Sequence, residues 1–426
     1  MLPRIMATAF DIFLGKSAPG AWSASMDAAL AHVRETASRL ALAARADDVP
    51  AMRAAVSEIL LFILAACRLQ GFDIDALSSG MAEKIRRRMQ PREGDGRHGS
   101  WKAGKAREKA LPPSPAEISP ELPPLMRIPK ILRGVSHPNP SLDGFCAHVE
   151  AGELGSAIFS LGAFAFAGKL DAEHALRTAC NKFITRLSYA EGVLAGKGLR
   201  LLEVPLDDMM ALWHEAKRIP KPKAPLEPAT LAPFRSGMAG ADDLLALAES
   251  LADPAAGDSW TLSQSPFSIA LHAVEEAYEV ADAWRKQDMP LFAEELGDMM
   301  MQVVFIAENC RRAGYFGFAD ILRNAPGIPP RTGIFAGMPE GFSATAAALW
   351  LQKMAVQNGF EWRDEDAAIA KVHEEVAELA AEIEKGDTLK AEDELGDLLF
   401  ATVKLARWRG IAVDDAIVAG IREHFA

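Results

Sequence analysis

The feature that most constrains the fold of this chain is a pair of short acidic clusters within residues 271–302. The first cluster has the spacing EExxE and the second has the spacing ExxD. Apolar residues fill most of the positions around the acids, which predicts a helix for each cluster. Residues three or four positions apart share one face of a helix. The acids that face one way are therefore Glu276 and Glu279 in the first helix, and Glu295 and Asp298 in the second.

The segment between the two clusters, RKQDMP, predicts a break between two antiparallel helices. It is polar, and Pro290 is tolerated in the first turn of a new helix. Such a hairpin would turn four carboxylates toward one another on an otherwise apolar face, where they repel unless a cation lies between them. A hard divalent cation with oxygen ligands, above all Mg²⁺, suits this arrangement.

The same acid pattern recurs within residues 370–402 at one constant offset. The matching acids are Glu375, Glu378, Glu394 and Asp397. A run of acids is often only a solvated helix face, and this reading competes with the metal site for a single EExxE. A solvated face, however, has no reason to keep its acid spacing while the residues around it change. The repetition therefore favours two metal sites.

EExxE followed by ELGD, with an apolar run after it, resembles the MazG family of all-α nucleoside triphosphate pyrophosphohydrolases. The segments 258–269 and 349–362 are similar to the family's lead-ins to its two modules, although Asp-Ser stands before Trp260 where the family has Cys-Pro. The resemblance implies that each acid quartet binds Mg²⁺, which holds a nucleoside triphosphate, and that the products are a monophosphate and pyrophosphate. The implied fold class is all-α, with tandemly duplicated MazG-like four-helix-bundle modules.

The resemblance covers nearly the whole chain, as two MazG-like copies in tandem. In the first copy, residues 22–90 keep few of the acids. The predicted organisation is a degenerate module at 1–90, a linker at 91–135, a degenerate and partly deleted module with a basic C-terminal helix at 136–221, a linker at 222–235, an intact module at 236–325, a linker at 326–345, and a module with intact acids but a truncated C-terminus at 346–426.

The two copies differ in complementary ways. The first has lost most acids but keeps basic residues that resemble the family's module ends: Lys84, Arg87 and Arg88 in one module, and Lys182 and Arg186 in the next, followed by Trp213. The second copy has every acid but lacks convincing basic ends. We therefore expect an internal pseudo-dimer in which the first copy completes the metal sites of the second by contacting phosphates and base. Ordinary solvated helix ends are the competing interpretation.

Several further residues are weaker site candidates. Glu275 and Glu374 each precede an inward-facing pair, and we expect them either to take a proton from water or to support the metal ligands. At a surface position they would be ordinary acids. Lys353 and Trp362, in the lead-in to the last module, are candidates for phosphate and base contact.

Composition limits the partners and the location. The formal net charge of −12 argues against a general nucleic-acid binder. The longest apolar run, residues 59–67, is too short to span a bilayer and is expected to be a core helix, so no membrane partner is predicted. The N-terminal sequence has no clean signal peptide. A cytoplasmic location is the expectation.

Two other functional classes compete with the pyrophosphohydrolase. A di-iron carboxylate bundle would need Glu-x-x-His on two helices, and neither EExxE has it. A non-catalytic nucleotide sensor or scaffold derived from a MazG enzyme is the alternative that stays open, because half of the chain has lost most of its acids. The sequence also leaves open the base and sugar preference, the working acid quartet, and whether the internal pseudo-dimer forms a further homodimer.

Overall fold

The computed structural model describes residues 26–90, 118–119, 122–133, 140–219, 236–323, 332–361 and 364–424. Within these ranges the regular structure is helical and contains no β-strand, which confirms the predicted all-α class. The chain divides into two compact units. Unit 1 comprises residues 1–112 and 223–329, and unit 2 comprises residues 113–222 and 330–426. Each unit thus combines a segment from the first copy with a segment from the second.

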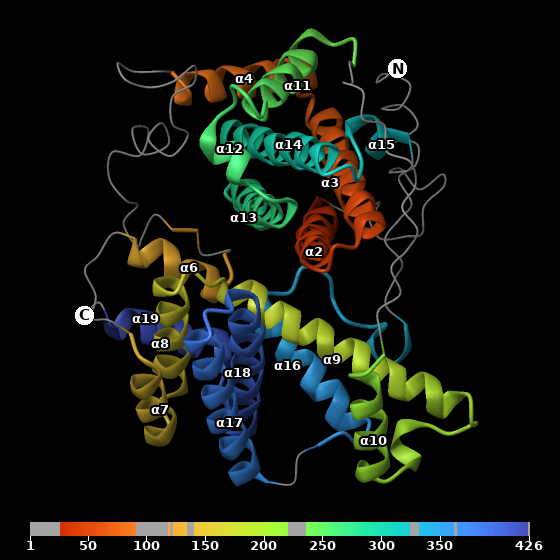
Figure 1. Cartoon of the computed structure of the whole chain (residues 1–426), viewed down its shortest axis with the longest axis vertical. Helices are drawn as coiled ribbons and strands as arrows, with labels where there is room; N and C mark the ends of the chain where they lie inside the picture. The colour runs from red at the N-terminus through yellow and green to blue at the C-terminus, as the bar shows by residue number, and fades with distance from the viewer. Residues whose placement is uncertain are drawn as a thin grey trace. The chain divides into compact units, whose positions relative to one another are not determined.

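Unit 1 contains two helical segments. The first has α2 (Met26–Arg45), α3 (Val49–Gln70) and α4 (Ile74–Arg88); the second has α11 (Ala239–Leu251), α12 (Ser259–Ser263), α13 (Pro266–Arg285), α14 (Met289–Arg312) and α15 (Phe318–Arg323). The helix pair α2–α3 packs against the pair α13–α14, which gives a four-helix core (Figure 1).

Unit 2 is built in the same manner. Its helices are α6 (Pro124–Leu132), α7 (Leu142–Ala151), α8 (Leu154–Ala167), α9 (Ala172–Ala195), η1 (Leu201–Glu203), α10 (Leu206–Ala216), η2 (Gly333–Phe335), α16 (Ala344–Gln357), α17 (Glu365–Glu384), α18 (Thr388–Trp408) and α19 (Val413–His424). The hairpin α17–α18 carries the second acid pattern, and α9 from the first copy packs along α18 and α16 (Figure 1).

The break predicted between the two acid helices is confirmed in both units. In unit 1, α13 ends at Arg285, and the side chain of Asp288 caps α14 by accepting a hydrogen bond from the backbone N–H of Leu291 at 3.1 Å. Pro290 lies in the first turn of α14, where a missing N–H costs nothing. In unit 2, Asp387 caps α18 in the same way. The sequence therefore fixes each hairpin turn locally.

Helix α3 contains the longest apolar run and is a core helix, as predicted. By length and composition it could cross a membrane, but 72% of its most apolar window is buried inside the protein. Ile59, Phe62 and Ile63 are each at most 1% exposed. Burying a side chain of this kind contributes about 1.5–3 kcal/mol. The apolar run is therefore accounted for by the core of unit 1.

The glycine of the ELGD motif allows α18 and α9 to cross closely. A Cβ atom added to Gly396 would lie 2.1 Å from the backbone oxygen of Ala175 on α9, which is far inside van der Waals contact. In unit 1 the matching Gly297 faces a flexible side chain instead, with Met81 Cε at 3.1 Å. In unit 2 this close crossing holds the basic helix α9 against the acidic face of α18.

The structure differs from the predicted organisation in two details. Residues 124–132, assigned to a linker, form α6, whose apolar side chains Leu125, Ile128 and Ile131 are buried. Pro124 and Pro129 within this stretch, and Pro123 just before it, concealed its helical period. The module at 136–221, which was expected to be partly deleted, keeps the ten-residue helix α7, which packs on α8.

Candidate functional site

Unit 2 brings three of its four predicted metal ligands together. Glu375 on α17 and Glu394 and Asp397 on α18 each offer a carboxylate oxygen, and these three oxygens all lie within 4.8 Å of one another. Glu378, one turn beyond Glu375, falls outside this cluster. It lies close enough to raise the pKa values of Glu375 and Glu394.

The electrostatics of this cluster favour a bound cation. Burial raises the pKa of Glu375 to about 7, against the lowering effect of Lys371 and with a further rise from Asp397. Burial and the charge of Asp397 also raise the pKa of Glu394. The Oε2 atom of Glu375 is shielded from solvent and accepts no hydrogen bond from the described residues. An oxygen donor set with such an unsatisfied atom fits a hard divalent cation.

Unit 1 repeats the cluster with Glu276, Glu295 and Asp298, whose oxygens also lie within 4.8 Å of one another. Burial, followed by the charges of Asp298 and Glu279, raises the pKa of Glu276 well above its ordinary value. Burial and Glu279 raise the pKa of Glu295 to about 8. As in unit 2, the fourth acid of the quartet acts on the cluster through its charge.

In unit 1 a lysine pairs directly with the acidic cluster. Lys84 Nζ donates to the two carboxylate oxygens of Asp298, at 2.8 and 3.0 Å, and to Glu294 Oε1 at 2.9 Å. Burial alone would lower the pKa of Lys84, but these ion pairs outweigh it and raise the pKa. Gln302 also donates to Glu276 Oε1, at 3.3 Å. The cluster of unit 1 is thus partly satisfied by the protein itself.

In unit 2 the corresponding lysine is more loosely held. Lys182 Nζ lies 3.4 Å from Asp397 Oδ2 and 3.6 Å from Asp393 Oδ1. One turn further along α9, the guanidinium of Arg186 lies over the ring of Trp213, 5.3 Å from its centroid. The structure therefore brings the first copy's Lys182, Arg186 and Trp213 to the second copy's acids, within one unit.

A cavity of about 600 Å³ lies beside the acids of unit 2. Its charged lining includes Lys182, Arg186, Lys371 and three of the acids, Glu375, Glu378 and Asp397. Its aromatic lining consists of Phe183, Trp213, Phe360 and Phe400. A cavity of this size, with a few convergent charges and a mostly apolar wall, is typical of a small-molecule site.

The remaining predicted site residues have varied positions. Glu374 is exposed, lines the cavity and accepts from Lys371 at 2.9 Å, whereas Glu275 on α13 is partly buried. Lys353 is exposed on α16 and is not part of the cavity lining. Arg87 is exposed and Arg88 is buried on α4. Trp362 lies outside the described residues.

Two comparisons identify the chain's relatives. The sequence model of the MazG nucleotide pyrophosphohydrolase domain matches residues 264–325 and 363–422, which contain the two acid hairpins. The nucleoside triphosphate pyrophosphohydrolase of Escherichia coli K12 is 31% identical over 212 residues, an alignment that covers 41% of this chain and 81% of that protein. The chain belongs to the MazG family.

Two further relatives are consistent with this assignment. The Thermotoga maritima protein named nucleoside triphosphate pyrophosphohydrolase/pyrophosphatase MazG is 29% identical over 212 residues, covering 43% of this chain and 81% of that protein. The uncharacterized protein YabN of Bacillus subtilis is 33% identical over 67 residues, which is 16% of this chain and 14% of that protein. The similarity thus extends over most of the length of the Escherichia coli and Thermotoga maritima proteins.

Sequence reasoning missed several residues that line the cavity of this MazG module. Lys371 contacts Glu374 at 2.9 Å and Glu375 at 2.7 Å, and its spacing of three and four residues from them was a signal in the sequence. Lys404 lies seven residues after Asp397, and therefore on the same face of α18. Phe183 is adjacent to Lys182. The charges could have been found by helical spacing, whereas the aromatic wall required the fold.

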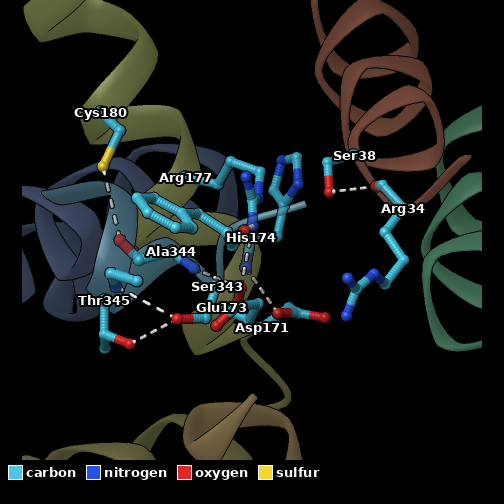
Figure 2. Close-up of polar contacts among 12 residues, drawn as sticks. Arg34, Ser38, Asp171, Glu173, His174, Arg177, Cys180, Ser343, Ala344 and Thr345 are labelled. Atoms are coloured by element: carbon cyan, nitrogen blue, oxygen red, sulfur yellow. Dashed lines mark hydrogen bonds and ion pairs between the residues drawn. The ribbon is translucent and has the colours of Figure 1, made fainter. Parts of the chain in front are cut away.

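A buried polar network fixes the basic helix of the MazG module in unit 2. Glu173 Oε1 accepts from the backbone N–H of Ala344 at 2.6 Å and from Arg177 Nη2 at 3.2 Å. Arg177 also donates to the carbonyl of Phe342 at 2.6 Å. Figure 2 shows Glu173 and Arg177 with Ala344 at the start of α16. These bonds join α9 of the first copy to the residues around the start of α16 in the second copy.

Proposed function

We propose that the protein hydrolyses nucleoside triphosphates to a monophosphate and pyrophosphate, and that the working site is the cavity of unit 2. The observation that carries this proposal is the composition of the cavity wall. Acids that fit a divalent cation, lysine and arginine side chains that fit phosphates, and aromatic rings that fit a base all line one cavity of about 600 Å³. Membership of the MazG family supports the same reaction.

Mg²⁺ is the proposed cofactor, held by Glu375, Glu394 and Asp397 with Glu378 nearby. The shielded Oε2 atom of Glu375 and the raised pKa values of the glutamates favour a cation with oxygen ligands at this place. When bound, Mg²⁺ would neutralise phosphate charge and lower the pKa of a coordinated water. The quartet of unit 1, Glu276, Glu279, Glu295 and Asp298, is the second proposed metal site.

The protein's own residues account for substrate binding in this proposal. Lys182 and Arg186 bind phosphate oxygens, because their cations line the cavity beside the acids. Trp213 stacks on the base, with Arg186 placed at its face. Glu374 lines the same cavity, and its carboxylate takes the proton of the attacking water. Glu275 is the matching candidate in unit 1.

The first copy has a site-completing role in this proposal. Lys182, Arg186 and Trp213 belong to α9 and α10, whereas the acids belong to α17 and α18. Both sets lie within unit 2, which combines residues 113–222 with residues 330–426. The internal pseudo-dimer would therefore bring the cations of the first copy and the acids of the second copy together in one site of a single chain. A further homodimer, a cytoplasmic location and the lack of a nucleic-acid partner stay predictions.

The decisive experiment measures pyrophosphate release from a panel of ribo- and deoxynucleoside triphosphates with Mg²⁺. The wild-type protein is compared with Glu375→Gln in unit 2 and Glu276→Gln in unit 1. We expect equal amounts of pyrophosphate and monophosphate, lost in Glu375→Gln and kept in Glu276→Gln. If only Glu276→Gln lost pyrophosphate release, the working site would be the acid cluster of unit 1. Binding of Mg-nucleotide without any release would support the alternative function, a nucleotide sensor.

A second experiment tests the contribution of the first copy. The double variant Lys182→Ala plus Arg186→Ala removes both cations from the cavity wall. We expect a loss of turnover of at least tenfold, since each charged hydrogen bond to phosphate contributes about 1.5–3 kcal/mol. The control is Lys197→Ala plus Arg200→Ala, which removes two exposed cations just beyond α9. Equal turnover in both double variants would refute the site-completing role.

A further inference from the structure

The cavity of unit 2 has an aromatic end, formed by Phe183 and three rings packed around it. The centroid of the Phe183 ring lies 5.2 Å from that of Trp213, 5.9 Å from that of Phe360 and 5.1 Å from that of Phe400. The rings of Trp213 and Phe360 are 5.2 Å apart. Aromatic rings accept any flat heterocycle by stacking, so this wall alone distinguishes bases poorly.

One buried lysine also lines this cavity, and it belongs neither to the metal cluster nor to the proposed phosphate-binding cations. Lys404 on α18 is 7% exposed. It follows Asp397, Phe400 and Ala401 at the spacings that place all four residues on one face of the helix. Seven residues of helix separate Asp397 from Lys404 by about 10 Å along the axis. Lys404 therefore belongs to the end of the cavity remote from the metal cluster.

The burial of Lys404 and the charges near it affect the strength of a hydrogen bond from its ammonium group to a ligand. Burial lowers the pKa of Lys404 to about 7, with Glu361 raising it and Arg407 lowering it further. The Glu361 carboxylate is held by Arg407, at 3.0 and 3.2 Å from Nη2. In a poorly solvated place a hydrogen bond to a ligand is stronger than at the surface, and a mismatched ligand group is correspondingly more costly.

Lysine Nζ carries N–H groups that donate hydrogen bonds in both its charged and its neutral form, and the charged form has no acceptor. Guanine and thymine present carbonyl acceptors, O6 and O4, where adenine and cytosine present amino donors, N6 and N4. Hypoxanthine resembles guanine, and uracil resembles thymine, at these positions. A buried donor facing the first group gains a bond, whereas facing the second group it loses its water without a replacement.

We propose that Lys404 is the residue that determines base specificity: it donates a hydrogen bond to the exocyclic carbonyl of the base and so selects hypoxanthine, guanine, uracil and thymine nucleotides over adenine and cytosine nucleotides. This inference rests on the proposed function, because it requires a base in the aromatic end of the cavity. It assigns a substrate class to that site and a role to a lysine that no part of the metal chemistry requires.

The test compares inosine triphosphate with adenosine triphosphate, which differ at the base carbon that carries either a carbonyl or an amino group. For the wild-type protein we expect kcat/KM to favour inosine triphosphate by roughly tenfold or more, the scale on which a site built for one hydrogen bond rejects a mismatched partner. In Lys404→Met, which keeps the apolar stem and removes the donor, the ratio should approach one. Lys390→Met, at an exposed lysine on the same helix, should keep the wild-type ratio.

A second variant and a binding measurement distinguish a misfolded variant from a wrong inference about Lys404 and from a wrong reaction. Lys404→Gln offers either a donor or an acceptor and should also bring the ratio close to one, so a folding failure of one variant leaves the other. Binding of the non-hydrolysable α,β-methylene analogues of both nucleotides, followed by tryptophan fluorescence, should show the same ratios. A wild-type preference that survives in both Lys404 variants, or no preference in wild type, would overturn the inference. If wild type binds the inosine analogue better, the Lys404 variants lose this preference, and no protein releases pyrophosphate, the inference about Lys404 stands and only the proposed reaction is refuted.

Discussion

Removing Lys84 is predicted to destabilise unit 1 and to increase its response to Mg²⁺. The Lys84 ammonium makes three contacts of 2.8–3.0 Å with Asp298 and Glu294, beside the acids Glu276 and Glu295. In Lys84→Met this cation is lost while the acids stay, so their mutual repulsion is no longer compensated. A divalent cation at the same acids would then stabilise the folded state more than it stabilises the wild-type protein.

The size of the effect follows from the burial of the pair. Leaving one partner of a fully buried ion pair alone costs about 3–5 kcal/mol, and an exposed pair contributes up to about 1 kcal/mol. The side chains of Lys84 and Asp298 are 13% and 15% exposed, whereas that of Glu294 is 57% exposed. We therefore expect a loss of about 2–3 kcal/mol in the free energy of unfolding, slightly below the buried range. Because the pKa of Lys84 is raised, this contribution is present in full at neutral pH and is lost only as the pH rises through the folded pKa.

Differential scanning calorimetry with and without Mg²⁺ measures both effects. For a unit of this size the loss corresponds to a decrease of roughly 4–12 °C in the unfolding midpoint. The matched control is Lys286→Met in the same unit, which removes a 2.7 Å pair with Asp282 whose lysine is 50% exposed, and which should cost less than about 1 kcal/mol. The reasoning is refuted if the two variants unfold alike, or if Mg²⁺ stabilises wild type and Lys84→Met equally.

Two further predictions concern the packing of unit 2. Gly396→Ala should destabilise the protein by about 1–3 kcal/mol in chemical denaturation, because the new Cβ meets the backbone of Ala175 at 2.1 Å. Gly297→Ala meets only the side chains of Met81 and Leu77 and should cost less, and equal losses would contradict the packing argument. Burial raises the pKa of Glu173 to about 7, against the lowering effect of Arg177. Because the pKa of this carboxyl is higher in the folded than in the unfolded state, the free energy of unfolding decreases as the pH rises between the two values. Glu173→Gln should therefore reduce the decrease in stability between roughly pH 4.5 and 7. An unchanged pH profile of stability would contradict this.

The acid hairpins could be predicted from the sequence because their determinants are local. The spacing of Glu375, Glu378, Glu394 and Asp397 follows the helical period, and the turn between the helices is specified by Asp387, which caps the second helix. Such features depend on residues a few positions away in the sequence, so they can be predicted without knowing the fold. The repeat at a constant offset then distinguished the acids from an ordinary solvated face.

The cavity could not be predicted, because its wall comes from segments far apart in the chain. Phe183, Trp213, Phe360 and Phe400 meet only after α9, α10 and α18 have packed. Each of these residues, considered alone, fits an ordinary core position. The short helix α6 was missed for another reason: Pro123, Pro124 and Pro129 are typical of a linker, and only the burial of Leu125 and Ile128 shows otherwise.

The position of the cavity in unit 2 follows from how the helices of the two copies cross. The second copy's acidic helix α18 crosses the first copy's basic helix α9 at Gly396, and the first copy's helix α8 crosses the second copy's terminal helix α19 at Gly155, whose added Cβ would lie 2.2 Å from the oxygen of Ala416. The two crossings are equivalent in position, since α9 packs on α18 and α19 packs on α8. On α8, Ser156 stands where α18 has Asp397, so this second crossing lacks part of the acid pattern. The other crossing keeps its acids and its cations together, and it is there that the cavity lies.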